Sequence, residues 1–182
     1  LGFRGEALPS IGAVARLTIA SRPAGASQAS SILVDAGLKH PVRPAALDKG
    51  TRVEVADLFF ATPARLKFLK TDRAEAQAVA DVVRRLAMAH PGVRFALAGE
   101  GTPALDYPAI PGEGPDALAG RLGQVLGIDF VTNSVAIDAA REDIGIGGLA
   151  GLPTFHKPTA SGIHLFVNGR PVRDKLLMGA VK

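Results

Sequence analysis

The sequence predicts an α+β fold, an α/β sandwich in which antiparallel strands pack against helices. Residues 51–60 alternate apolar and polar side chains with the period of two that is typical of a half-buried strand. Residues 72–90 instead repeat apolar side chains at helical spacing. A stretch with four prolines, 102–116, then separates these elements from a second strand-rich region, so we expect two domains, 1–112 and 113–182.

The first region is expected to begin with a loop and a short helix and to continue with strands. Gly2 and Gly5 disfavour a helix interior, so the helix begins after them, and Pro9 is tolerated only in its first turn. In the strand at 51–60 the valines point to one face and the charged residues to the other. The expected elements are a helix over 6–14 and strands over 17–21, 30–35 and 51–60.

The long helix is expected to begin at a capping box, because Asp72 is followed three residues later by Glu75. It ends before Pro91 and Gly92, which cannot continue a helix. The elements expected after it are a strand over 93–99, a helix over 116–127, strands near 131–138, 144–151 and 162–169, and a helix from 171. The chain has no initiator Met and stops inside that last helix, so we expect it to be a piece of a longer protein.

The composition excludes several classes of site. No Cys is present, which excludes disulfides, thiolate metal sites and Cys nucleophiles and fits a reducing cytoplasm. The four His are scattered, so no metal site is predicted, and no apolar run reaches the roughly 18 residues of a membrane span. A net charge of +4 is compatible with an anionic partner.

The first stretch with chemical content is GFRGEAL, residues 2–8. Two glycines let the backbone approach a ligand, the following helix points free N–H groups toward it, and Arg4 adds a charged donor. This pattern is typical of a phosphate site, and we expect Glu6 to face away and to bond to the backbone. The alternative is a plain Gly-rich turn followed by an acidic residue in the first helical turn.

Two further stretches have a possible binding role. Thr51 follows Gly50 at the start of a strand, where its hydroxyl can reach into a cleft, although a turn glycine before a β-branched strand residue gives the same pattern. Arg170, Arg173 and Lys175 follow a tight turn and can hold a phosphate backbone without reading sequence. The alternative for these three cations is a solvated surface.

Three segments of this chain resemble MutL-type DNA mismatch repair proteins of the gyrase/histidine-kinase/MutL ATPase superfamily. They are GFRGEALPSI, GTRVEVADLFFATPARLKFLK and LFVNGRPVRDKLL, which occur in the family's order and at similar spacing. The resemblance covers essentially the whole chain. It implies the C-terminal half of a Bergerat-type ATPase domain, a mixed or antiparallel sheet with helices on one face, and then part of a second domain with a left-handed β-α-β crossover, an exception to the usual hand.

The resemblance also implies roles for particular residues. The lid stretch would close over ATP and hold its phosphates, and Thr51 would help form the adenine pocket. Arg170, Arg173 and Lys175 would lie along a groove that binds DNA. The lid residues are Gly2, Phe3, Arg4, Gly5, Glu6, Ala7 and Leu8.

Other parts of the family's site are expected outside this chain. The catalytic Glu, the Asn that helps to hold Mg²⁺ and the Asp motif that reads adenine would precede Leu1, and the Lys that reaches the terminal phosphate would follow Lys182. Glu6 is not the general base. The full-length parent would therefore be an ATPase, whereas this segment alone would not hydrolyse ATP.

The function expected from the resemblance is an ATP-binding and ATP-hydrolysing switch in the bacterial cytoplasm, associated with the nucleoid. It would dimerise through its N-terminal region and coordinate mismatch repair on DNA with a mismatch-recognition protein and a downstream endonuclease or helicase. Two alternatives stay open. One is a nucleic-acid-binding module, and the other is a dimerisation unit, each without a working nucleotide site.

Overall fold

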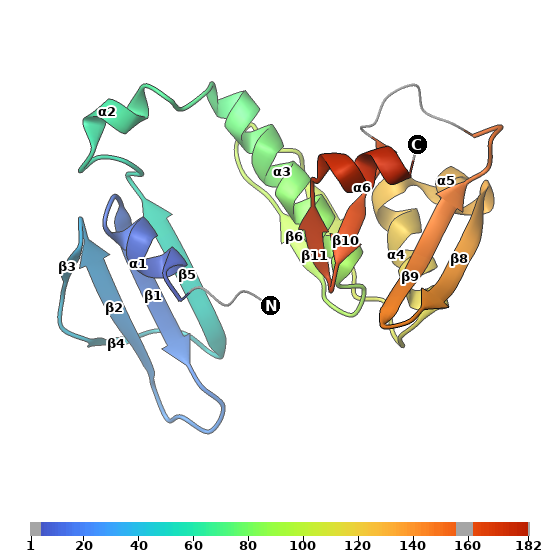
Figure 1. Ribbon diagram of the computed structural model, residues 1–182. Coiled ribbons are helices and arrows are strands. Elements are labelled where there is room, and N and C mark those ends of the chain that lie inside the picture. The colour runs from blue at the N-terminus through green and yellow to red at the C-terminus, as the bar shows by residue number, and fades with distance from the viewer. Residues whose placement is uncertain (1–4, 156–161, 182) are drawn as a thin grey trace. The chain divides into compact units, whose positions relative to one another are not determined.

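The computed structural model describes residues 5–155 and 162–181, and the chain divides into two compact units, Leu1–Lys70 and Thr71–Lys182. Helices and strands mix in both units, and the described strand pairs are antiparallel, which confirms the α+β class (Figure 1). The first unit contains α1 (Ala7–Gly12), β1 (Arg16–Arg22), β2 (Ala29–Asp35), β3 (Leu38–Lys39), β4 (Arg43–Ala45), β5 (Gly50–Ala56) and α2 (Pro63–Leu66). The second contains α3 (Asp72–Ala89), β6 (Phe95–Leu97), β7 (Leu105–Tyr107), α4 (Pro115–Leu126), α5 (Ile128–Thr132), β8 (Ser134–Arg141), β9 (Ile144–Gly151), β10 (Leu165–Val167), β11 (Arg170–Val172) and α6 (Lys175–Ala180).

The first unit is a sheet with the strand order β3-β2-β1-β5, in which β4 also pairs with β2. Side chains alternate across it as the sequence predicts. Leu17 lies opposite Val34 and Val55, whereas the ion pair between Arg52 and Glu54 lies on the other face. The sheet therefore has one apolar and one polar face.

Helix α1 covers the apolar face at the point where Gly12 meets the sheet. A Cβ atom added at Gly12 would lie 2.9 Å from Cγ1 of Val34 and 3.5 Å from Cδ2 of Leu17, so only a glycine allows this close approach. Pro9 stands at the third position of α1, in the first turn, as predicted.

Strand β5 ends at Ala56, earlier than the predicted residue 60. Asp57 and Phe59 adopt positive φ angles of 52° and 68°, which break the extended conformation. Arg16 donates a hydrogen bond to the carboxylate of Asp57, and its guanidinium lies 4.7 Å from the ring centroid of Phe60. These contacts hold the turn against β1, and alternation in the sequence alone did not reveal them.

Helix α3 begins one residue earlier than the capping box suggested, with Thr71 as its N-cap in place of Asp72. The Thr71 hydroxyl accepts a hydrogen bond of 3.3 Å from the amide of Ala74. The helix ends at Ala89, two residues before Pro91, as predicted.

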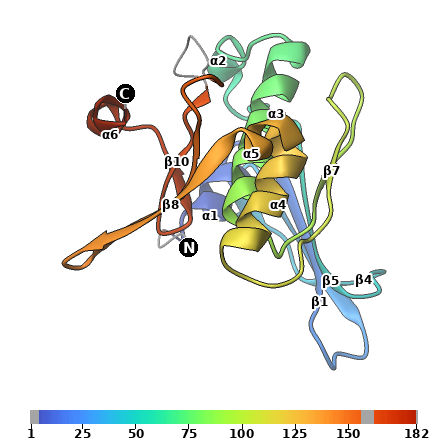
Figure 2. The same cartoon turned by 90° about the vertical axis from the view of Figure 1, so that its right-hand side faces the viewer.

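Helices α3 and α4 pack together in the second unit around one buried cation (Figure 2). Arg121 of α4 is fully buried and donates hydrogen bonds to the carbonyl oxygens of Pro91, Val93, Tyr107 and Pro108, at distances of 2.7 to 3.4 Å. Burial lowers the pKa of this guanidinium, and the nearby Tyr107 opposes that shift. The side chain of Arg121 thus joins α4 to the segment before β6 and to the end of β7.

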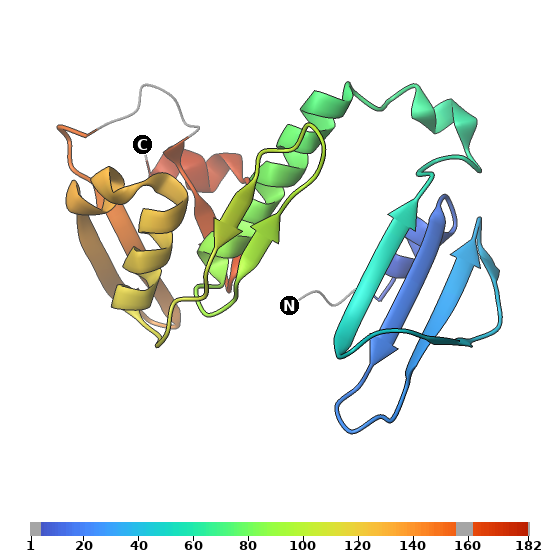
Figure 3. The same ribbon diagram turned by 180° about the vertical axis from the view of Figure 1, so that it is seen from behind.

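The hairpin of β6 and β7 corrects the prediction for the proline-rich stretch (Figure 3). Strand β7 lies inside the stretch 102–116, which was expected to be a boundary between two domains. Its pairing with β6 and the bonds of Arg121 join this stretch to α3 and α4. The compact units divide between Lys70 and Thr71. The predicted domain boundary at 112/113 stays a prediction.

The last part of the chain forms two separate hairpins, β8 with β9 and β10 with β11. The predicted strand at 162–169 is shorter, and β11 occupies residues that were predicted to begin a helix. Helix α6 starts only at Lys175, because the Asp174 carboxylate caps the amides of Leu176 and Leu177. The described strand pairs include no crossover between parallel strands, so its hand stays a prediction. None of the described helices has the length and apolar character needed to cross a membrane.

Candidate functional site

The predicted phosphate stretch is described only from Gly5 onward, and Gly2, Phe3 and Arg4 lie outside the described residues. Glu6 is the N-cap of α1, and its carbonyl accepts a 2.9 Å hydrogen bond from Ser10. The third residue of α1 is Pro9, which has no N–H group. The amide donors of the first helical turn are therefore those of Ala7 and Leu8.

One detail of this stretch differs from the sequence-based expectation. The Glu6 side chain makes no capping hydrogen bond, because Glu6 itself occupies the N-cap position in a helical conformation, with φ of −93° and ψ of −10°. Gly5 is exposed, and an added Cβ there would meet nothing within 4 Å. The backbone at Gly5 is therefore open to a ligand.

Thr51 stands at the other end of the same sheet face as α1. Its hydroxyl oxygen lies 2.9 Å from that of Ser21, which pairs with it across β1 and β5, and Ser21 alternates onto the face of Leu17. Gly50 adopts a positive φ of 83°, which turns the chain into β5 as the pattern predicted. An open cavity of about 650 Å³ adjoins Thr51 and is also lined by Arg22 and Lys49.

The sheet face between α1 and Thr51 is apolar and partly uncovered. Ile19 pairs with Val53 there, and Val53 and Val55 are 49% and 47% exposed. An apolar surface with a hydroxyl at one end and helix amides on the same face is chemically suited to a flat ring with a phosphate tail. Residues 5–8 do not line the Thr51 cavity, so the two predicted parts share a sheet face and not a pocket.

Metal ligands are not gathered in this region. Across residues 5–155 and 162–181, no group of three His, Asp or Glu side chains could hold a metal ion.

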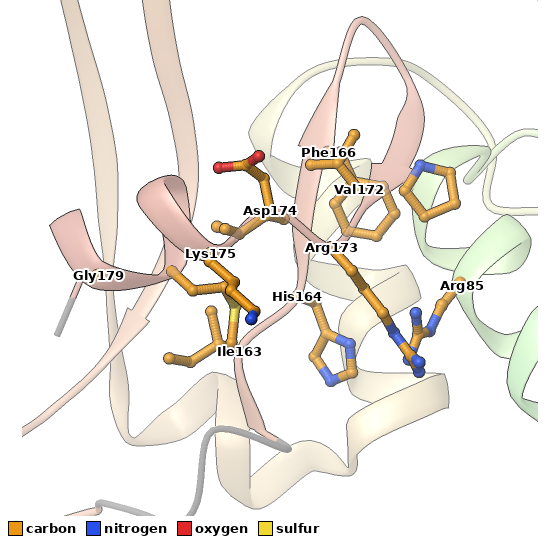
Figure 4. A pocket seen from close by; sticks show the side chains of 12 residues that line it. Arg85, Ile163, His164, Phe166, Val172, Arg173, Asp174, Lys175 and Gly179 are labelled. Atoms are coloured by element: carbon orange, nitrogen blue, oxygen red, sulfur yellow. The ribbon is translucent and has the colours of Figure 1, made fainter.

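A second cavity, of about 570 Å³, lies within the second unit between α3, the hairpin of β10 and β11, and α6 (Figure 4). Two of the three predicted DNA-binding residues, Arg173 and Lys175, line it. The third, Arg170, stands at the exposed start of β11, two residues after the turn at Asn168, and is not among the lining residues. The sequence analysis therefore identified basic residues of this surface, but it did not predict that two of them line a cavity.

Arg85 and His164 also line this cavity, and sequence analysis missed both. Arg85 comes from α3, and His164 immediately precedes β10. Arg85 is 88 residues before Arg173 (173 − 85), and only the packing of α3 on β11 brings them to one cavity. No local spacing could have revealed this.

Comparisons with known proteins agree with this architecture. The family described as "DNA mismatch repair protein, C-terminal domain" matches residues 122–182. The chain is 60% identical to the DNA mismatch repair protein MutL of Rhodopseudomonas palustris (strain HaA2) and 57% identical to that of Agrobacterium fabrum, over its whole length in both cases. It spans about three tenths of these relatives, 30% and 29% of their lengths.

Solved structures give the same result for the fold. The Aquifex aeolicus MutL ATPase domain complexed with ADP superposes with a TM-score of 0.76 at 29% identity, and covers 96% of this chain and 65% of its own. A further structure of an Aquifex aeolicus MutL ATPase domain has a TM-score of 0.70 at 26% identity, with 99% and 68% covered. Both neighbours are ATPase domains, in agreement with the predicted fold.

Proposed function

Because the chain belongs to the MutL family of DNA mismatch repair proteins, we propose that it is part of an ATP-dependent switch that acts in mismatch repair. In this proposal, residues 5–8 and the sheet face that ends at Thr51 hold part of the nucleotide. The basic surface of the second unit holds DNA. The relatives are about three times as long as this chain, so the remaining parts of the switch belong to segments of the parent beyond it.

The nucleotide proposal rests above all on the shared sheet face of α1 and Thr51. The amides of Ala7 and Leu8 can donate to phosphate oxygens, and the half-exposed face at Val53 and Val55 can receive the purine. The Aquifex aeolicus ATPase domain, which has this fold, binds ADP, and this supports the assignment.

ATP would supply the bond that is hydrolysed and, with Mg²⁺, the charge that orders the surrounding backbone. The described residues of this chain would bind the nucleotide and orient it. The amides of α1 align the phosphate tail, and the Ser21–Thr51 hydroxyl pair orients the base. The general base and the metal ligand come from outside this chain, so we propose that the segment binds nucleotide without hydrolysing it.

DNA contact in the second unit would be made to the phosphate backbone. Arg170, Arg173 and Lys175 are exposed cations on one hairpin and the helix that follows it, and the hairpin presents no aromatic platform for bases apart from Phe166, which is partly buried. Contacts of this kind position DNA without reading sequence and weaken with salt.

The complete switch would couple these two sites. ATP would order the residues around Gly5, the ordered state would favour dimerisation of the N-terminal region, and hydrolysis would reverse it. The dimer would then pass a mismatch signal to an endonuclease or helicase. This part of the proposal rests on the family and not on a contact in the structure.

The test is equilibrium binding of a non-hydrolysable ATP analogue and of duplex DNA to the full-length protein. We expect binding of both, with more dimer in sedimentation when the analogue is present. Binding of DNA without any binding of nucleotide would favour the module that lacks a nucleotide site, and binding of neither would leave only a dimerisation unit.

A further inference from the structure

The cavity of the second unit gathers basic side chains from three elements. Arg85 comes from α3, Arg173 follows β11, and Lys175 begins α6, with His164 beside them. In Figure 4 the side chains of Arg85 and Arg173 point toward one another and His164 lies next to them. Two guanidinium groups that converge in one cavity repel each other unless an anion lies between them.

No carboxylate of the described residues takes that place. Within residues 5–155 and 162–181, ion pairs are seen at Arg16, Arg52, Arg84 and Arg94, and none is seen at Arg85 or Arg173. Asp174 lines the cavity, but its Oδ1 atom accepts hydrogen bonds of 2.9 and 3.0 Å from the first amides of α6, and its side chain points away from both arginines. The cavity is therefore positively charged.

The chemistry of the lining fits a phosphate group. Each guanidinium presents parallel N–H donors that match two phosphate oxygens, and Lys175, which also lines the cavity, adds an ammonium group. Phe166, Val172 and Met178 are partly buried and form the apolar part of the lining, which strengthens the charge interaction by lowering the local dielectric. A volume of about 570 Å³ leaves space for the sugar attached to a phosphate.

We propose that Arg85 of α3, together with Arg173, binds one backbone phosphate of DNA in this cavity. The inference rests on the proposed DNA contact and extends it from the hairpin of β10 and β11 to the long helix. A phosphate held by both arginines would tie α3 to β11, so that DNA binding also stabilises the packing of these two elements.

The experiment compares four variants of the full-length protein in binding to a labelled duplex, measured by fluorescence anisotropy at several salt concentrations. Arg85→Gln removes the proposed ligand. Arg84→Gln is the matched control, because Arg84 is the adjacent residue of α3, carries the same charge and is paired with Asp81 at 2.9 Å. Arg173→Gln and the double variant R85Q/R173Q complete the cycle, and melting temperatures verify that each variant is folded.

We expect Arg85→Gln to weaken binding roughly eightfold at about 0.1 M salt, the loss that corresponds to one phosphate contact with a salt slope of about 0.9. Arg84→Gln should bind like the wild type. The double variant should lose less than the product of the two single losses, because both arginines hold the same phosphate. If Arg85→Gln unfolds the protein, Arg85→Lys, which retains the charge but not the fork, should still bind more weakly than the wild type.

The outcomes separate this inference from the function on which it rests. If Arg173→Gln weakens binding while Arg85→Gln and Arg84→Gln both bind like the wild type, α3 does not hold phosphate, but the DNA contact stands. If the wild type does not bind DNA, the proposed function itself fails.

A competition experiment identifies the source of the phosphate. If inorganic phosphate displaces the duplex at constant ionic strength from the wild type but not from Arg85→Gln, the cavity accepts a free phosphate group. If inorganic phosphate has no effect although Arg85 is required for duplex binding, the site requires the phosphodiester of a DNA backbone. Both results support the pocket, whereas equal displacement from both proteins contradicts it.

Discussion

The hydroxyl oxygens of Ser21 and Thr51 lie 2.9 Å apart where β1 and β5 pair, on the sheet face that α1 also covers. This pair places a polar group at the end of an otherwise apolar face. Thr51→Val keeps the shape of the side chain and removes the hydroxyl. We expect nucleotide affinity to fall about fivefold, corresponding to about 1 kcal/mol for one hydrogen bond. Isothermal titration of the full-length protein with an ATP analogue measures this.

The matched control for that variant is Thr18→Val. Thr18 lies in β1, opposite Leu33 and Glu54, on the polar face of the sheet. The same chemical change there should leave nucleotide affinity unaltered. Equal losses in both variants would indicate a general effect on β1 and would remove Thr51 from the site.

The second prediction concerns Arg121, whose guanidinium is bonded to four carbonyl oxygens in the second unit. Arg121→Met fills part of the volume but removes the guanidinium donors from these carbonyl oxygens, of which that of Pro91 keeps the amide of Ile110 as a donor. We expect a loss of about 3 kcal/mol in the free energy of unfolding. Urea unfolding followed by the fluorescence of Tyr107, the one tyrosine in a chain without tryptophan, measures it.

An exposed arginine in the same unit provides the comparison. Arg94 forms an ion pair with Asp106 at 2.8 Å, and their hydrogen bond raises the pKa of Arg94 and lowers that of Asp106. Because water screens this pair, Arg94→Met should shift the urea midpoint far less than Arg121→Met does. A larger shift for Arg94→Met would contradict the central role of the buried cation.

The third prediction concerns Gly12, where α1 meets the sheet. Gly12→Ala places a Cβ atom 2.9 Å from Val34 and should destabilise the first unit by roughly 1–3 kcal/mol through overpacking. Gly5→Ala meets nothing within 4 Å and should leave the unit's stability unchanged. Thermal unfolding of the two variants compares them, and equal melting temperatures would contradict the close packing of α1.

The fourth prediction concerns the basic hairpin. Reversing Arg173 or Lys175 to Glu should weaken DNA binding and reduce the steepness of its salt dependence, because fewer counterions are released. ATP affinity should be unaltered, since both residues lie in the second unit and Thr51 in the first. Anisotropy titrations over a range of salt concentrations measure the slope, and an unchanged slope would refute the assignment.

Much of the fold could be predicted because local patterns determine it. Alternation of valines and charges identified β5, and the apolar repeat before Pro91 identified α3. The errors occurred where tertiary contacts decide. Strand β7 forms inside a proline-rich stretch because it pairs with β6, and β5 stops at Asp57 because Arg16 holds the turn.

The residues of the candidate sites could likewise be predicted only where a local pattern marks them. Thr51 and Arg173 were found because a glycine or a tight turn precedes each of them in the sequence. Arg85 has only helical neighbours, and its place beside Arg173 depends on how α3 packs on β11. A single sequence contains no local signal for such a pair.

The most direct test of the nucleotide site is amide hydrogen exchange in the full-length protein, with and without a non-hydrolysable ATP analogue and Mg²⁺. If the phosphates lie at the start of α1, the amides of Gly5, Glu6, Ala7 and Leu8 should exchange at least about tenfold more slowly when the analogue is bound, as expected for new hydrogen bonds of about 1.4 kcal/mol or more. Unchanged exchange at these four amides, with the analogue bound to the protein, would contradict the account.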